Sequence, residues 1–394
     1  MSEEPQTYGA SALRYLDNAA TTPVDPEVAE AMARSLREDY GNPSSLYPLG
    51  ARAHRLLEEA RELVSGMLGA RTVVFTGGGT EATNLAMRGQ FTAGRTGRVL
   101  VGAADHPSVL ETARALEAQG CELSVCPVDR LGRLDVEAFT DLCGEDLRLV
   151  SILYGNNEVG TLPPLEPLVA AVRERAPRAH LHVDAVQAFC KVHFDLDRLG
   201  LDSASIAAHK IHGPKGVGAL ALGARRRPEP VVTGGGQEQG LRSGTEDVCG
   251  IRGLALAADR WISDLAGIGA RLAGMRARVL EALARDGVAH ERVGDPEHCL
   301  PHVLSLSFPG VSGEVAMNWL AERGLCVSTG SACSQRGEKG GKTGSKVLRA
   351  MGLPDEVVQG TLRISFGRFT TDADVDALCR ELPAVVGELR ALGL

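Results

Sequence analysis

The scarcest features of this chain are aromatic side chains, positive charge and long apolar runs. Aromatic residues make up 4% of its 394 residues, too few for the stacking surface with which proteins hold single-stranded nucleic acid. The formal net charge is −8, so no overall positive charge is present to bind a phosphate backbone. No apolar run reaches the length of a membrane span, and residues 1–9 lack the apolar core of a signal peptide. We therefore expect no direct nucleic-acid partner and no membrane partner.

Cysteine pairs are missing as well, although cysteine itself is not. The nine cysteines are an odd number in a long chain, and no CxxC pair occurs, which argues against a disulfide framework. No HExxH motif occurs either, and we expect no metal site. This cysteine usage, without a targeting segment, predicts a reducing compartment, the cytoplasm by default.

The first half of the chain alternates between strand and helix patterns. Short apolar runs are followed by amphipathic helical stretches, and the expected strands are residues 73–75, 99–101, 123–125, 149–154 and 180–184. This alternation predicts an open, mostly parallel α/β sheet. Its functional loops should lie at the carboxyl ends of the strands.

A second domain is expected after a long helical stretch. Residues 251–284 are rich in Ala, Leu and Arg, and the pattern beyond them is α+β. We therefore predict a large α/β domain at 15–255. A smaller α+β domain should follow at 256–394, with residues 1–14 as an N-terminal arm.

One lysine lies between two apolar runs. The runs before and after Lys210 read as strands, joined by a tight loop that contains glycines and a proline. Lysine is rarely buried without a partner, and burial lowers its pKa and makes the amine nucleophilic. This stretch alone leaves two interpretations equally open: a Schiff-base lysine, or a lysine that extends to solvent beside a turn.

A glycine turn follows the first expected strand of the large domain. Residues 76–81 read Thr-Gly-Gly-Gly-Thr-Glu and open a helix. Free N–H groups and the helix dipole make such a turn an anion site. The turn has neither the lysine of a P-loop nor the GxGxxG of a dinucleotide fold, so a plain strand-to-helix turn is the alternative.

An aspartate closes the strand at 180–184. Asp184 follows a run that reads as a buried strand, and a carboxylate there needs a cationic partner. Pyridoxal phosphate requires a carboxylate for its pyridinium nitrogen and a lysine for its aldehyde, and Lys210 provides the second. The turn that contains Gly79 and Thr80 would hold the phosphate. Each feature alone is weak, but jointly they favour this cofactor.

One cysteine precedes a cationic loop. Cys333 stands in Ser331-Ala332-Cys333-Ser334, and residues 336–346 are rich in Gly, Lys and Arg. A thiol at the base of such a loop should be exposed, with its thiolate favoured. The alternative, a buried cysteine used as a small apolar side chain, suits Cys190 and Cys326 better because they lie in apolar runs.

These residues lie within motifs that, taken together, resemble one family over nearly the whole chain, from Tyr15 to the C-terminal helix. The motifs are Leu16-Asp17-Asn18-Ala19-Ala20-Thr21-Thr22, Gly41-Asn42-Pro43-Ser44-Ser45, Thr80-Glu81-Ala82-Thr83-Asn84, Asn156-Asn157-Glu158-Val159-Gly160, His182-Val183-Asp184-Ala185-Val186-Gln187, His209-Lys210, Gly234-Gly235-Gly236-Gln237-Glu238, Arg242-Ser243-Gly244-Thr245, Gly330-Ser331-Ala332-Cys333 and Leu362-Arg363-Ile364-Ser365. The chain resembles the cysteine desulfurases, class V aminotransferase-like enzymes of pyridoxal phosphate fold type I. The resemblance implies a large domain with a mostly parallel seven-stranded sheet and a smaller α+β domain that carries the cysteine loop.

The resemblance also implies roles for individual residues at the cofactor. Lys210 would form the Schiff base, His106 would stack on the pyridine ring and relay protons, Asp184 would pair with the ring nitrogen, and Gln187 would bond the phenolic oxygen. Gly79, Thr80 and His209 would hold the phosphate, with Thr245 contributed by the other subunit of a homodimer.

At the substrate, the resemblance implies that Asn157 and Arg363 grip the carboxylate and that Cys333 accepts the sulfur. L-cysteine would become L-alanine, and the persulfide on Cys333 would pass to an acceptor protein of iron–sulfur cluster assembly, tRNA thiolation or a dedicated pathway. Two positions depart from the family: Ala207 replaces a serine that donates to the phosphate, and Tyr47 replaces a histidine.

Two other interpretations stay open. A selenocysteine lyase, or another class V lyase or transaminase, would keep the cofactor and change the reaction. A non-catalytic scaffold for sulfur-relay partners would need neither Lys210 nor Cys333, and the presence of both residues argues against it.

Overall fold

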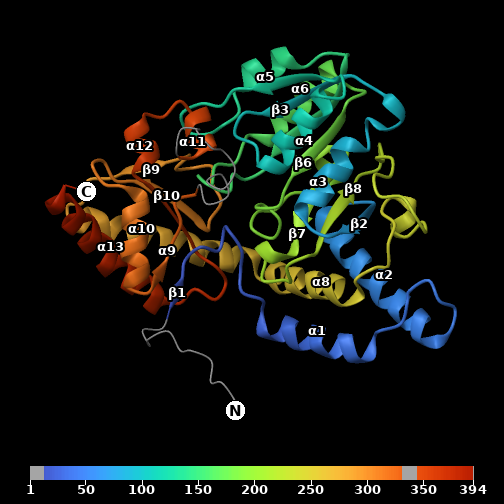
Figure 1. The fold of residues 1–394 in the computed structure, drawn as a ribbon, viewed down its shortest axis with the longest axis horizontal. Helices are drawn as coiled ribbons and strands as arrows, with labels where there is room; N and C mark the ends of the chain where they lie inside the picture. Colours follow the sequence, from blue (N-terminus) through green and yellow to red (C-terminus); the bar gives the residue numbers. More distant parts are fainter. Residues whose placement is uncertain (1–12, 331–343, 394) are drawn as a thin grey trace.

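The computed structural model describes residues 13–330 and 344–393 of the chain. Figure 1 shows a larger part around a central sheet and a smaller part that contains the C-terminal helix. Cys333 and residues 1–12 of the expected arm lie outside the described residues.

The larger part is built on a seven-stranded sheet with the order β2-β8-β7-β6-β5-β3-β4. Neighbouring strands pair in parallel except at β8, which is antiparallel to both β2 and β7. The mostly parallel seven-stranded sheet predicted from the sequence is therefore confirmed. The strands are β2 (Thr72–Thr76), β3 (Arg98–Gly102), β4 (Glu122–Cys126), β5 (Leu147–Leu153), β6 (His180–Asp184), β7 (Ser203–Ala207) and β8 (Gly218–Leu222).

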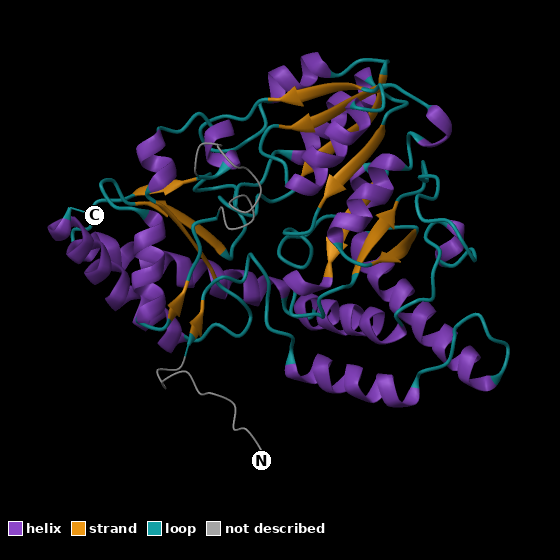
Figure 2. Ribbon diagram, viewed as in Figure 1, coloured by secondary structure: helices purple, strands orange, loops and turns teal. Residues whose placement is uncertain are grey.

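Helices pack around this sheet (Figure 2). Successive residues of β2 enter different apolar cores: Val74 packs with Leu85 of α3, whereas Val73 and Phe75 pack with Leu57 of α2. Because both faces of the sheet are covered, strands such as β2 and β8 are largely apolar runs, whereas β6 and β7 alternate apolar residues with buried His, Asp and Ser side chains. The helices of this part are α1 (Pro26–Glu38), α2 (Pro48–Leu68), α3 (Gly79–Arg88), α4 (Pro107–Glu117), α5 (Val136–Leu142), α6 (Leu165–Arg175), α7 (Leu196–Leu199) and α8 (Val248–Ile262).

The smaller part contains a three-stranded antiparallel sheet with the order β12-β10-β9. The short strand β1 near the N-terminus pairs in parallel with β11, which ties the start of the chain to this part. The strands are β1 (Arg14–Tyr15), β9 (Glu291–Val293), β10 (Val303–Ser307), β11 (Leu325–Cys326) and β12 (Thr361–Ser365). The helices are α9 (Leu265–Arg285), α10 (Gly313–Glu322), α11 (Lys346–Ala350), α12 (Asp355–Gln359) and α13 (Asp372–Leu392), and the 3-10 turns of the whole chain are η1 (Thr92–Gly94), η2 (Ala208–Lys210) and η3 (Glu238–Gly240).

The helical stretch expected over residues 251–284 is two helices. α8 ends at Ile262, and α9 begins after Asp264, whose carboxylate accepts from the backbone N–H of Gly267 and caps the new helix. The Ala, Leu and Arg composition continues across the break, so periodicity alone did not reveal it. The domain division between 255 and 256 falls within α8 and stays a prediction.

Among the described residues, no helix combines the length and apolar character needed to cross a membrane. In the same residues, no group of three His, Cys, Asp or Glu side chains is placed to hold a metal ion.

Candidate active site

A cavity of about 560 Å³ opens at the carboxyl ends of β5, β6 and β7. Its wall also includes residues of the smaller part, among them Gly330 and Lys346. The predicted site residues that line it are Gly79, Thr80, His106, Asn157, Asp184, Gln187, His209, Lys210 and Arg363. The tertiary structure thus brings together side chains that the sequence places far apart.

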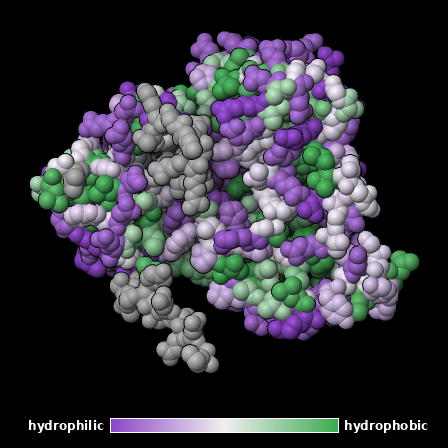
Figure 3. Space-filling view, viewed as in Figure 1, coloured by the Kyte–Doolittle hydropathy of each residue, from purple (hydrophilic) through white to green (hydrophobic). Residues whose placement is uncertain are grey.

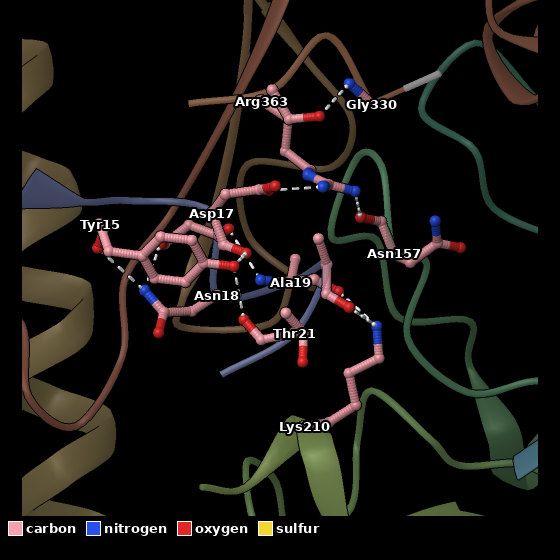
Figure 4. Close-up of polar contacts among 12 residues, drawn as sticks. Tyr15, Asp17, Asn18, Ala19, Thr21, Asn157, Lys210, Gly330 and Arg363 are labelled. Carbon is pink, nitrogen blue, oxygen red and sulfur yellow. Dashed lines mark hydrogen bonds and ion pairs between the residues drawn. The ribbon is translucent and has the colours of Figure 1, made fainter. Parts of the chain in front are cut away.

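Lys210 ends the 3-10 turn η2, directly after β7. Its Nζ points into the cavity and donates to the carbonyl oxygens of Ala19 at 2.6 Å and Ala20 at 2.8 Å (Figure 4). The backbone of Lys210 is held from behind, because Nζ of the buried Lys191 donates to its carbonyl oxygen at 2.7 Å. Lys210 thus faces a cavity, as a Schiff-base lysine would, and its role stays a prediction.

Asp184 is the last residue of β6, and its side chain is buried at one wall of the cavity. Its Oδ1 accepts from the backbone N–H of Val186 at 3.1 Å, and the nearby Ser205 on β7 lowers the pKa of the carboxyl. Burial raises the pKa of Asp184, and the nearby His106 and Lys210 oppose that rise. A cation placed beside this carboxylate would keep it ionised.

His106 caps the N-terminus of α4 and faces the same cavity. Its Nδ1 accepts from the backbone N–H of Ser108 at 3.1 Å, which leaves the hydrogen of the neutral ring on Nε2. Burial lowers the pKa of His106, and Lys210 adds to the effect while Asp184 opposes it. The ring is therefore neutral at pH 7.

The glycine turn opens α3 as expected. The helix begins at Gly79, with Thr80 in its first turn. A Cβ at Gly79 would lie 2.6 Å from Cγ2 of Val186, so only glycine lets the turn approach the loop after β6 this closely. His209 lines the same cavity, with its Nδ1 3.2 Å from Oγ1 of Thr21, and burial lowers the pKa of His209 to about 4. The turn offers backbone N–H groups and a hydroxyl to an anion.

Gln187 carries a polar atom that no other described residue satisfies. Its Nε2 donates to the carbonyl oxygen of Ala19 at 2.9 Å, but its buried Oε1 has no hydrogen-bond partner among the described residues. A buried polar atom without a partner is costly unless a ligand supplies one. The cavity therefore combines this amide with the Lys210 amine, the Asp184 carboxylate and the anion-binding turn at Gly79. Together these groups match the polar groups of pyridoxal phosphate.

Arg363 projects from β12 into the far side of the cavity (Figure 4). Its Nη1 donates to the carbonyl oxygen of Asn157 at 2.9 Å, and its Nη2 donates to Oδ1 of Asp17 at 2.6 Å. The buried Nε has no hydrogen-bond partner among the described residues. The guanidinium is thus fixed by two contacts and keeps donors for a substrate carboxylate.

Two of the predicted residues are not placed at the cavity. Thr245 is exposed and lines a separate, smaller hollow with Phe75, Gly216 and Glu246, so its predicted role needs a second subunit. Cys333 lies outside the described residues.

Three residues at or behind the site escaped the sequence reasoning. Asp105 lines the cavity beside His106, and burial raises its pKa to about 8. Lys191 is buried with its Nζ over the ring of Trp261, and burial lowers its pKa to about 7. Asp17 pairs with Arg363. Asp17 lies within the first motif noted in the sequence and Asp105 directly precedes the predicted His106, which were the available signals, whereas Lys191 gave no periodic signal.

Comparison with known proteins agrees with this geometry. The profile of the family described as "Aminotransferase class-V" matches residues 14–378. "Cysteine desulfurase IscS 1" of Archaeoglobus fulgidus is 38% identical over 382 residues, which cover 96% of this chain and 98% of that protein. The structure titled "NIFS-LIKE PROTEIN" superposes with a TM-score of 0.88 at 35% identity, covering 96% of this chain and all of that one.

A further solved structure was determined with an amino acid bound. "SspA in complex with cysteine" superposes with a TM-score of 0.77 at 28% identity, covering 91% of this chain and 100% of that one. The profile match and the identity to the Archaeoglobus protein both extend over nearly the whole chain. The chain therefore belongs to the aminotransferase class-V family and, within it, to the cysteine desulfurases, which depend on pyridoxal phosphate.

Proposed function

We propose that this chain removes sulfur from L-cysteine as a persulfide on Cys333 and passes that sulfur to an acceptor protein, with L-alanine as the other product. The observation that carries the proposal is one cavity that joins the Lys210 amine, the Asp184 carboxylate and the Arg363 guanidinium. The carboxylate of an α-amino acid would pair with the Arg363 guanidinium, and its amine would displace the Lys210 amine from the cofactor. The neighbour titled "SspA in complex with cysteine" supports cysteine as that amino acid.

The chain's own residues divide the work at the cofactor. Bound pyridoxal phosphate would supply an electron sink for the carbanion formed at the substrate Cα. Lys210 would hold the cofactor covalently and, once the substrate amine displaces it, take the Cα proton on Nζ. Asp184 would keep the ring nitrogen protonated. His106 would stack on the ring and, being neutral at pH 7, could exchange a proton through Nε2.

The other polar residues would hold the two ends of the complex. Gly79, Thr80 and His209 would bind the phosphate, and Gln187 would bond the phenolic oxygen through its amide. Arg363 would bind the substrate carboxylate in its fork, oriented by Asn157 and by Asp17.

Sulfur transfer needs a thiol, and we assign that role to Cys333, which lies outside the described residues. The Cys333 thiolate would attack the substrate sulfur, forming an S–S bond while the substrate C–S bond breaks. The electron pair of that bond stays on the former Cβ, which takes up a proton to become the methyl group of L-alanine. The overall change converts the Cys333 thiol and L-cysteine into a Cys333 persulfide and L-alanine, without an external oxidant.

We further propose that the chain acts as a homodimer in the cytoplasm. Thr245 is exposed and away from the cavity of its own chain, as a residue that serves a partner's phosphate would be. Exposed apolar side chains gather where α1 meets α2, over the lower right of the molecule in Figure 3, and would be covered in a dimer. The acceptor protein stays open among the three classes given above.

The test is incubation of the purified protein with L-cysteine and pyridoxal phosphate, with L-alanine quantified and the persulfide on Cys333 read by mass spectrometry. We expect equal amounts of both products in a first turnover. Cys333→Ala should bind L-cysteine and form no persulfide, and Lys210→Ala should lose the absorbance of the covalently held cofactor. Full L-alanine release by Cys333→Ala would contradict the role of Cys333.

A further inference from the structure

Glu158 lies next to Asn157 in the cavity wall. The side chain of Asn156, two positions before Glu158, braces this loop. Oδ1 of Asn156 accepts from the backbone N–H of Glu158 at 2.8 Å and from that of Val159 at 3.0 Å. Nδ2 of Asn156 donates to the carbonyl oxygen of Ala104 at 3.1 Å. The loop after β5 is therefore tied to the loop after β3, and the position of Glu158 is fixed.

The Glu158 carboxylate contacts two residues that are distant in sequence. The hydroxyl of Ser345 donates to its Oε2, and the same hydroxyl oxygen caps α11 by accepting from the backbone N–H of Leu348 at 3.1 Å. Gly330 packs against the carboxylate so closely that a Cβ there would lie 3.2 Å from Oε2. Gly330 has a φ of 78°, which favours glycine at this point.

Gly330 and Ser345 flank the stretch that contains Cys333. The last residue described before that stretch is Gly330, and Ser345 lies one position beyond the first residue described after it. One carboxylate therefore hydrogen-bonds one flank, at Ser345, and lies beside the other, at Gly330, on the wall that also includes Arg363 and Lys346. Neither a substrate role nor a cofactor role accounts for this arrangement.

The charges around Glu158 come from several elements. Arg363 faces it from β12 and is itself paired with Asp17, and Lys346 begins α11 beside Ser345. Burial raises the pKa of Glu158 to about 7, while the Ser345 hydrogen bond and Arg363 oppose the rise. Near neutral pH the carboxylate therefore changes between a strong hydrogen-bond acceptor and a protonated acid.

We propose that Glu158 is a positioning residue, whose carboxylate holds Gly330 and Ser345 together at the cavity wall and so sets where the chain that carries Cys333 leaves and rejoins that wall. This inference rests on the proposed function of Cys333. Glu158 acts through these two residues and makes no bond to the reacting atoms. It should therefore affect sulfur transfer and leave amino-acid binding intact.

The test compares Glu158→Ala, Glu158→Gln and Ser345→Ala with the wild-type holoenzyme. The matched control is Glu388→Gln, a carboxylate paired with Arg323 away from the cavity. Binding of L-cysteine is read from the change in cofactor absorbance, and persulfide formation on Cys333 is followed by rapid quench. Hydrogen exchange of the Leu348 amide reports on the Ser345 cap.

We expect Glu158→Ala to bind L-cysteine normally, to form the persulfide about 10- to 100-fold more slowly, and to exchange the Leu348 amide faster. Ser345→Ala should behave in the same direction, and Glu388→Gln should match the wild type. In the wild type the persulfide rate should fall as pH drops through about 7, because Glu158 protonates and the Cys333 thiolate is lost, and Glu158→Gln should make that fall shallower by removing the first cause.

A wild-type persulfide rate in Glu158→Ala would overturn the inference, as would unchanged Leu348 exchange. Loss of L-cysteine binding would also overturn it, because it would make Glu158 a substrate-binding residue. Absence of persulfide in the wild-type protein would instead overturn the proposed function, so the two failures are distinguishable.

Discussion

Arg363 illustrates how single side chains define the amino-acid subsite. Its guanidinium is buried, and its orientation depends on a carbonyl oxygen of Asn157 and a carboxylate oxygen of Asp17. Asp17 also neutralises the charge before substrate arrives. The fork geometry of the remaining donors, more than net charge, should therefore select a carboxylate.

Replacing Arg363 by Lys keeps the charge and removes the fork. Loss of a charge-assisted hydrogen bond costs about 1.5–3 kcal/mol, so we expect kcat/KM for L-cysteine to fall about 10- to 100-fold. Steady-state kinetics of the holoenzyme measure this, with cofactor absorbance unchanged. Arg368→Lys is the control, because Arg368 pairs with Asp25 outside the cavity. Equal kcat/KM values for Arg363→Lys and Arg368→Lys would contradict the role of Arg363 in binding the substrate carboxylate.

Ala207 is the second position that matters as a single residue. It ends β7, lines the cavity, and its Cβ lies 3.6 Å from the place of a Cβ on Gly79. A hydroxyl here could donate to an anion held by the turn of α3. Ala207→Ser should therefore tighten binding of pyridoxal phosphate about 5- to 10-fold, since such a bond contributes about 1 kcal/mol. Titration of the apoenzyme measures the Kd.

The control for that titration is Ala207→Cys, which adds a side chain of nearly the same size with a weak donor. It should bind the cofactor like the wild type. If serine and cysteine gave the same Kd, the phosphate would not lie against Ala207.

At the scale of elements, β6 combines apolar burial with ionisable groups. His180 and His182 are fully buried on this strand and share the hydroxyl of Ser203 on β7, with ring nitrogens 2.8 and 2.9 Å from its Oγ. Burial lowers the pKa of each to about 3. The strand that ends in Asp184 is thus stable only with neutral histidines.

The pH dependence of stability follows from these histidines. In the unfolded chain a histidine protonates near pH 6.5, whereas in the folded protein it stays neutral to about pH 3. The unfolded state binds more protons between these values, so each histidine destabilises the fold as pH falls through that window, by up to about 1.4 kcal/mol per pH unit. Above pH 6.5 the effect is absent.

We therefore expect His182→Asn to flatten the fall in the free energy of unfolding between pH 6.5 and 4 relative to the wild type. Denaturant titrations of cofactor-saturated protein at several pH values measure this. His193→Asn, at an exposed histidine, should leave the slope as in the wild type. If the free energy of unfolding fell equally with pH in the wild type and both variants, His182 would protonate in the folded state within this pH range, contrary to the prediction.

At the scale of the whole molecule, one exposed apolar surface indicates a subunit interface. Side chains where α1 meets α2 are apolar or aromatic and exposed: Leu36, Tyr40, Leu46, Tyr47 and Leu49. Leu46 is 99% exposed. Thr245 is exposed as well and does not reach the cavity of its own chain. A symmetric dimer would explain both features. It would cover the exposed apolar side chains, and it would place Thr245 beside the phosphate bound by the partner subunit.

Leu46→Asp should therefore shift the protein towards monomers in sedimentation experiments and weaken binding of pyridoxal phosphate about tenfold, through loss of the partner's Thr245 hydroxyl. Leu392→Asp, at another exposed leucine near the C-terminus, is the control and should change neither property. A Leu46→Asp protein that stays dimeric would remove this surface from the interface.

The sequence by itself determined the α/β class and most of the cavity. The strands could be located because both faces of the sheet are covered, which makes strands such as β2 and β8 short apolar runs, and β6 ends in the polar Asp184. The motifs around Lys210 and Arg363 then implied their roles, and both residues line the cavity. Local patterns are enough where a residue's environment is set by its own strand or turn.

Only the tertiary structure decided which distant groups meet. Asp17 and Arg363 are 346 positions apart, and Ser345 reaches Glu158 across 187. The break between α8 and α9 depends on one capping carboxylate within an unchanged composition. Hydrogen bonds and ion pairs between remote segments leave no periodic trace in the sequence, because they depend on how packed elements place side chains in space.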